Sequence, residues 1–242
     1  MNRYEKRFIA FIDIIGFKKI IGKSVANDSH ISIDSVKEAL AFKEPIGKEK
    51  LILGGIGDIS DSDHRMTTFS DNILISVNNN SKGFFNILNH AERIGFELLK
   101  MNFLCRGGIT MGKIYHDEQF VFGPGLIRAH ELESKKANKP RIIIDKNVMD
   151  FKDSLDPTGQ KLFRRFTKKD ESDGYFFIDT LRTIRFLMQQ IYEPPNDVKE
   201  LVRSIKTHIH NQIEKNRNDP KVLDRLDWFL KYLDDSTNRD FI

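Results

Sequence analysis

The sequence predicts an α+β fold, in which strands and helices alternate around one sheet and two helices follow at the end. Three observations support this prediction. Apolar runs of strand length occur over 8–15, 66–77 and 103–111. Apolar residues recur at helical spacing from 84 to about 101. Near the end of the chain, two apolar stripes are typical of amphipathic helices separated by a break.

Local signals place the elements of the first half. The expected order is a strand over 8–15, a helix from 17 to about 21, a helix around 33–42, two strands within 66–77, a helix over 84–101 and a strand over 103–111. Gly16 ends the first strand, and the loop over 78–81 caps the third helix. The tight turn between the paired strands contains Asp71. Gly107 and Gly108 interrupt the last strand, where they allow a bulge or a close backbone approach.

The second half is predicted in the same way. Its expected elements are a strand over 120–122, a helix opened by Pro124, a strand over 141–144, a strand over 175–178, and helices over 198–213 and 223–233. The composition changes after about Asp179. We therefore expect a catalytic domain over 1–180 and a helical segment over 181–242, packed on the main sheet or on a partner chain.

Composition bounds the class of protein. The chain has 242 residues, a net charge of +4, 39% hydrophobic and 31% charged residues, as in ordinary globular proteins. This balance does not indicate a nucleic-acid tail, and its mild basic excess suits an anionic substrate. One cysteine, Cys105, excludes an internal disulfide and a thiolate zinc cluster, and its apolar surroundings favour a buried, inert thiol. The chain shows neither a signal sequence nor an apolar run of the roughly 20 residues that span a bilayer, so we expect a cytoplasmic protein without membrane contact.

Two aspartates stand out because each lies in an otherwise apolar, β-prone run. Asp13 precedes Gly16 at the end of the first strand, and Asp71 lies in the hairpin turn. Charged side chains are rarely left in such runs without a partner. Carboxylates at adjacent strand ends can hold a divalent metal against phosphate oxygens. The alternative is that Asp13 caps a helix and Asp71 merely occupies a turn.

Four motifs in order carry a resemblance to a known family. They are Phe11-Ile-Asp-Ile-Ile-Gly-Phe17, Phe69-Ser-Asp-Asn72, Arg106-Gly-Gly-Ile-Thr-Met-Gly112 and Phe122-Gly-Pro-Gly-Leu-Ile-Arg-Ala-His-Glu-Leu-Glu133. Over residues 8–145 the chain resembles the palm-like, ferredoxin-like βαββαβ core of class III nucleotidyl cyclases. The resemblance implies a homodimer in which each site takes metal ligands from one chain and base or transition-state contacts from the other.

The resemblance also assigns roles to residues. Asp13, Asp71 and the backbone carbonyl of Ile14 would hold two Mg²⁺ or Mn²⁺ ions. One ion would activate the ribose 3′-hydroxyl and the other would neutralise the leaving pyrophosphate.

Four residues are expected to contact the phosphates of the substrate. The backbone N–H groups of Gly16, Phe17 and Lys18 would cradle phosphate at a helix start, or form an ordinary strand-to-helix turn. Arg106 would grip phosphate oxygens with its planar guanidinium, or form a surface ion pair.

The chain departs from the adenylate cyclases of this family at several positions. Ile127 and Glu131 replace an Asn and an Arg that contact the transition state, and Arg128 is a candidate substitute. Thr67 and Phe120 stand where a Lys and an Asp read adenine. Adenylate cyclase is therefore a poor assignment.

The later motifs, together with Lys139-Pro-Arg-Ile-Ile143, resemble the bacterial pyrimidine cyclases of Pycsar antiphage systems. This implies that UTP, or next CTP, is converted to a 3′,5′-cyclic nucleotide, an antiphage signal read by a separate effector. Two alternatives stay open. One is a palm enzyme that joins two nucleotides, against which the Phe69-Ser-Asp-Asn72 hairpin argues. The other is a non-catalytic nucleotide sensor with the same fold.

Overall fold

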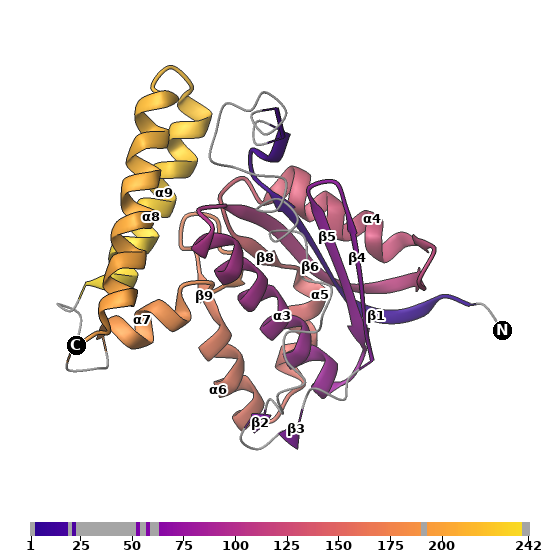
Figure 1. The fold of residues 1–242 in the computed structure, drawn as a ribbon. Coiled ribbons are helices and arrows are strands. Elements are labelled where there is room, and N and C mark those ends of the chain that lie inside the picture. The colour runs from indigo at the N-terminus through magenta and orange to yellow at the C-terminus, as the bar shows by residue number, and fades with distance from the viewer. Residues whose placement is uncertain are drawn as a thin grey trace.

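A computed structural model describes residues 3–18, 21–22, 52–53, 57–58, 63–189 and 193–238. It confirms the α+β prediction: a twisted sheet is covered by helices, and two long helices stand at one side (Figure 1). The helix expected around 33–42 lies outside the described residues. No helix within the described ranges is long and apolar enough to cross a bilayer.

The sheet contains the ferredoxin-like core that the sequence predicts. The strands are β1 (Glu5–Ile14), β2 (Ile52–Leu53), β3 (Gly57–Asp58), β4 (His64–Phe69), β5 (Asn72–Asn78), β6 (Cys105–His116), β7 (Val121–Phe122), β8 (Ile142–Ile144), β9 (Thr167–Lys169) and β10 (Phe176–Ile178). The main sheet has the order β4-β5-β1-β6-β8-β10-β9, with β7 paired to β6. In this order β4, β5, β1 and β6 are antiparallel neighbours, and β8 pairs with β6 in parallel. Strand β1 is therefore central, with β5 on one side and β6 on the other.

The three longest helices form where the apolar stripes predict them. They are α3 (Ser81–Lys100), α4 (Pro124–Glu131), a π-helix η1 (Leu132–Lys136), α5 (Lys146–Asp153), α6 (Pro157–Phe166), α7 (Arg182–Gln189), α8 (Asn196–Lys215) and α9 (Pro220–Thr237). The side chain of Asn80 caps α3, and that of Asp219 caps α9. Apolar side chains of α8 and α9 pack in one cluster with Ile143 and Phe177 of the sheet. The expected packing of this segment on the main sheet is thus confirmed.

Strand β1 separates two layers because its side chains alternate between the faces of the sheet. Phe8, Ala10 and Ile12 belong to the large apolar cluster under α3. Ile9 and Phe11 belong to a small cluster that includes α4 residues. Helices α3 and α4 therefore cover opposite faces, and the second face is only partly apolar. We call it the α4 face.

The glycines of β6 allow close packing instead of interrupting the strand. The predicted interruption at Gly107–Gly108 is wrong, because both residues stay in register with β1 and with β8. The predicted close approach is confirmed. A Cβ on Gly107 would lie 2.5 Å from the Phe11 carbonyl oxygen, and one on Gly108 would lie 2.4 Å from the Cβ of Leu132. Gly108 thereby lets the start of η1 lie directly against β6.

We expect Gly108→Ala to destabilise the protein by about 1–3 kcal/mol, the usual cost of overpacking a filled core. The added methyl group has no space between β6 and Leu132, so η1 must shift. Urea unfolding of both proteins measures the loss.

Gly22→Ala is the matched control, because a Cβ there meets no atom of the described residues within 4 Å. It should leave the free energy of unfolding unchanged or slightly higher. Equal stability of the two variants would contradict the packing role assigned to Gly108.

Candidate functional site

The two predicted metal-binding aspartates lie side by side where β1 ends and the β4–β5 turn begins. Asp13 is the penultimate residue of β1, opposite Asn72 on β5 and Arg106 on β6. Asp71 lies in the β4–β5 turn, where Ser70 adopts a left-handed φ of 55°. The N–H of Ile14 donates to the Asp71 carbonyl over 3.0 Å. This backbone bond holds the turn against the end of β1.

The surroundings of the Asp13 carboxyl disfavour its charged form. Burial raises its pKa above the ordinary value, and the neighbouring Asp71 carboxylate raises it further, while the Arg106 guanidinium opposes both effects. The net direction is upward, so Arg106 does not fully compensate the charge of Asp13. A carboxylate pair of this kind is stabilised when a cation binds between its members.

Arg106 lies between two carboxylates. Its Nε–H donates to Asp13 Oδ2 over 3.1 Å, and the same nitrogen is 2.6 Å from Glu133 Oε1. The side chain is 25% exposed. Its two terminal amino groups have no hydrogen-bond partner among the described residues, so they are available to an anion.

Glu133 is a site residue that the sequence analysis did not single out. Its side chain is 4% exposed, it lies in η1, and burial raises the pKa of its carboxyl while Arg106 opposes the shift. π-Helices often occur at functional sites, where the extra residue redirects a side chain. The available signal was an acidic residue directly after Leu132, a buried residue of the predicted helix.

The charge balance of this cluster fits a divalent cation. Asp13, Asp71 and Glu133 contribute three negative charges and Arg106 one positive charge, which leaves −3 + 1 = −2. In the described part of the chain, His, Cys, Asp and Glu nowhere gather in threes as a ready metal site. The site thus offers few protein ligands. Mg²⁺ usually accepts this, because it keeps water and phosphate in its coordination shell.

The predicted phosphate cradle lies next to Asp13. Gly16 adopts a left-handed φ of 79°, and residues 17–18 and 21–22 are helical. Phe17 is only 7% exposed because its ring belongs to the core under α3. Phe17 can therefore contribute its backbone N–H to a ligand, but not its side chain.

Arg128 lies on α4 and is held by an ion pair with Asp145. Its Nε and Nη2 atoms donate to the two oxygens of Asp145 over 2.9 and 2.7 Å. Thr110 donates to the same carboxylate. Burial raises the pKa of Asp145, but the hydrogen bonds from Arg128 and Thr110 outweigh it, so the net shift is downward. Thr110 pairs with Ile9 of β1, four residues before Asp13 and so roughly 13 Å along the strand. Within one chain, Arg128 is not part of the Asp13 cluster.

Thr67 lies on the same α4 face, where the register places it level with Phe11 of β1, two residues before Asp13. The Thr67 hydroxyl is 2.9 Å from Nε2 of His116, whose Nδ1 is 2.8 Å from the Ser76 hydroxyl. Burial and the nearby arginines lower the pKa of His116 to about 4, so the ring is neutral at pH 7. Phe120 is 60% exposed at the turn before β7. His116 was not predicted from the sequence, because its partners Thr67 and Ser76 lie on β4 and β5, which β1 separates from β6 in the sheet.

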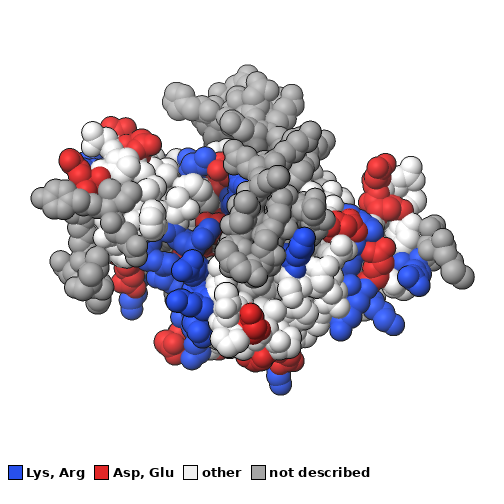
Figure 2. All heavy atoms as spheres, turned by 90° about the horizontal axis from the view of Figure 1, so that it is seen from below, with Lys and Arg blue, Asp and Glu red and all other residues white. Residues whose placement is uncertain are grey.

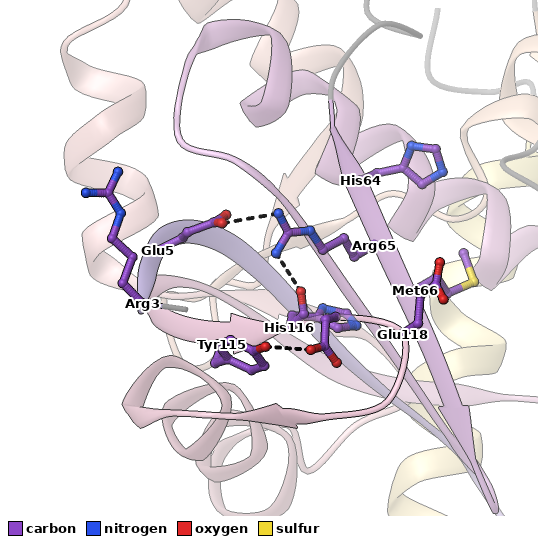
Figure 3. Close-up of a pocket in the computed structure, with 9 residues that line it drawn as sticks. Arg3, Glu5, His64, Arg65, Met66, Tyr115, His116 and Glu118 are labelled. Carbon is purple, nitrogen blue, oxygen red and sulfur yellow. Dashed lines mark hydrogen bonds and ion pairs between the residues drawn. The ribbon is translucent and has the colours of Figure 1, made fainter. Parts of the chain in front are cut away.

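A cavity of about 750 Å³ opens beside this histidine (Figure 3). Arg65 crosses it and donates to Glu5 and to the His116 carbonyl, while the Tyr115 hydroxyl donates to Asp117. Glu5 and Arg65 are therefore paired with each other, and Asp117 is bound by Tyr115. Behind it, Arg7 is 1% exposed and donates to four neighbouring side chains.

Cys105 has the inert environment that the sequence predicts. It is 7% exposed, and burial raises the pKa of its thiol to about 12. It is therefore not a nucleophile at neutral pH.

Comparison with known proteins gives only distant structural likenesses. No model of a known protein family matches the chain, and no curated protein matches its sequence. The monomeric guanylyl cyclase domain of the RhoGC fusion protein from the aquatic fungus Blastocladiella emersonii is 16% identical, with a TM-score of 0.46, over 73% of this chain and 96% of that one. The catalytic core of a rhodopsin-guanylyl cyclase with converted specificity, in complex with ATPαS, is 15% identical with a TM-score of 0.40, over 73% and 96%.

The adenylate/guanylate cyclase/hydrolase from Silicibacter pomeroyi is 14% identical with a TM-score of 0.36, over 72% and 95% of the two chains. Likenesses of this size leave the function of the chain to be inferred from its own residues.

We expect Asp13→Asn to be more stable than the parent protein at neutral pH without divalent cations. The raised pKa of Asp13 means that the folded state binds more protons than the unfolded state between the ordinary carboxyl value and the raised one. The stability that this group contributes is present at low pH and is lost as the pH rises through the folded pKa. Urea unfolding between pH 4 and 7.5 measures it.

The gain of Asp13→Asn should shrink as the pH falls, because both side chains are then neutral. Asp150→Asn, at an exposed helix position, is the control and should show no such pH dependence. A lower stability of Asp13→Asn at neutral pH would contradict the assignment of uncompensated charge to this site.

Proposed function

We propose that the chain is a metal-dependent nucleotidyl cyclase that converts a pyrimidine nucleoside triphosphate, UTP before CTP, to the 3′,5′-cyclic nucleotide and pyrophosphate. The observation that carries this proposal is the Asp13–Asp71 pair at the end of β1, beside Arg106. Its net negative charge suits a divalent cation, and the available groups of Arg106 suit the triphosphate.

The chain's own residues have separable tasks in this proposal. Asp13, Asp71 and the Ile14 carbonyl are the groups that would hold Mg²⁺ or Mn²⁺. Bound divalent ions supply activation of the 3′-hydroxyl and neutralisation of pyrophosphate. The terminal amino groups of Arg106 bind phosphate oxygens, and its Nε remains on Asp13. The Gly16 turn presents backbone N–H groups to the same phosphates.

A second copy of the chain would complete each site. The α4 face carries Asp13 at the end of β1 and Thr67 on the edge strand β4, and a two-fold arrangement would place the α4 faces of two copies against each other. Large apolar side chains are exposed on or beside this face: Phe69, Phe120, Phe122 and Ile127. Exposed apolar clusters of this kind are typical of protein interfaces. In such a dimer Arg128, Thr67 and Phe120 would face the partner's aspartates.

The base preference rests on Thr67 and Phe120. The His116–Thr67 hydrogen bond fixes the Thr67 hydroxyl, which can accept or donate to a base edge and therefore does not separate uracil from cytosine. Phe120 would narrow the space for the base and favour a single ring. The product would then act as an antiphage signal for a separate effector.

Two features of the site favour the second candidate, a nucleotide sensor without turnover. The Nε of Arg106 already pairs with Asp13 and Glu133, and Arg128 is clamped by Asp145. If neither arginine moves to substrate, nucleotide binds without reaction. Product analysis separates the two candidates.

The direct test is incubation with ATP, GTP, CTP and UTP at equal concentrations with Mn²⁺, followed by mass spectrometry. We expect cyclic UMP, then cyclic CMP, as the main products of the parent protein and almost none from Asp71→Asn. Cyclic AMP or cyclic GMP as the dominant product would overturn the base assignment. Nucleotide binding with no cyclic product would favour the sensor.

Arg106→Lys tests the phosphate contact. Lysine keeps the charge but lacks the planar fork, so catalysis should fall by at least about tenfold. Arg203→Lys, at an exposed position on α8, serves as the matched control with unchanged kinetics. Steady-state rates that are equal in all three proteins would leave Arg106 with a purely structural role.

A further inference from the structure

A second cavity lies between α6 and α7, on a different part of the molecule. It measures about 700 Å³ and is open to the surface. Its described lining residues are Arg164, Arg165, Arg182, Thr183, Arg185, Phe186 and Leu187. Four of these are arginines and none is acidic. Seen from below, basic side chains gather on the side of the molecule where α6 and α7 lie (Figure 2).

Two of the arginines are fixed by buried carboxylates. Arg182 donates to Glu92 over 3.0 Å, and the Glu92 side chain is 3% exposed. Arg185 pairs with Asp179, which is fully buried. Both guanidiniums remain partly exposed, at 34% and 26%. They are therefore held in place at the wall of the cavity, at little further entropic cost to a ligand.

The other two arginines carry uncompensated charge. Arg164 and Arg165 end α6, are exposed, and form no hydrogen bond or ion pair with any described residue. The cavity is lined by four guanidiniums, and two of them are paired with carboxylates. The net charge around the cavity is therefore +4 − 2 = +2. Guanidiniums gathered in this way are typical of phosphate recognition, because each offers a planar pair of donors.

One wall of the cavity is apolar. Phe186 is 55% exposed, so its ring is accessible to a ligand in the cavity. Leu187 lies beside it in the lining. An exposed aromatic ring next to arginines suits a flat ring that carries phosphates. The volume falls within the roughly 300–1,000 Å³ of ordinary small-molecule sites.

This cavity is separate from the Asp13 cluster. The two share no lining residue. The end of β1 leads to the indigo helical turn at the top of Figure 1, whereas α6 and α7 lie at the bottom and left. A ligand of one site would not touch the other.

We propose that the α6–α7 cavity binds a nucleotide, with its phosphates on Arg164, Arg165, Arg182 and Arg185 and its base against Phe186. This inference does not depend on the proposed catalytic activity, because it uses none of the residues of the Asp13 site.

Isothermal titration calorimetry with UTP and ATP tests this site, with EDTA present to suppress metal-dependent binding, and again in the Asp13→Asn/Asp71→Asn chain. Both chains should bind one nucleotide per molecule at physiological salt. Arg164→Ala/Arg165→Ala should weaken that binding by at least about tenfold. Both residues are exposed and unpaired, so the melting temperature should be unchanged.

Two comparisons make the test specific. Arg203→Ala/Arg217→Ala removes the same charge from the exposed surface of α8 and the following turn, and should leave binding unchanged. Phe186→Ala should weaken nucleotide binding but leave inorganic triphosphate unaffected. Equal losses in the two arginine pairs would show diffuse electrostatics and overturn the proposal. So would no nucleotide binding, or triphosphate binding as tightly as nucleotide with no effect of Phe186→Ala.

Discussion

The candidate site depends on one guanidinium shared between carboxylates. Arg106 is the only described cation in direct contact with Asp13 and Glu133, and Asp71 adds a further negative charge next to Asp13. The pKa values of both Asp13 and Glu133 are raised, so one arginine does not balance the cluster. Such an arrangement costs stability when the protein is alone and gives binding energy to a ligand that brings positive charge.

The surrounding fold is arranged to hold that cluster together. Strand β1 is central, so β5 and β6 present Asn72 and Arg106 on either side of Asp13. The backbone bond from Ile14 fixes the turn that carries Asp71. On β6, Gly108 lets η1 approach until Glu133 reaches Arg106. These contacts join segments more than 20 residues apart in sequence, so the site forms only when the sheet does.

The sequence predicted what depends on local pattern. The strand end at Asp13, the hairpin at Asp71 and the long helices were all found from apolar period and turn chemistry. Helices α5 and α6, by contrast, are short, and no element was predicted over their residues. Glu133 and His116 were missed because their partners come from strands distant in sequence. Arg128 is a surface-helix residue by pattern, and only the structure reveals that Asp145 holds it.

The central claim is that Asp13 and Asp71 form a divalent-cation site for a nucleotide. Electron paramagnetic resonance of Mn²⁺, titrated into the protein with a non-hydrolysable UTP analogue, measures this directly. We expect the parent protein with the analogue to lower the free Mn²⁺ concentration more than the analogue alone does, and Asp13→Asn/Asp71→Asn to abolish this difference. The same Mn²⁺ uptake in the double variant would contradict it.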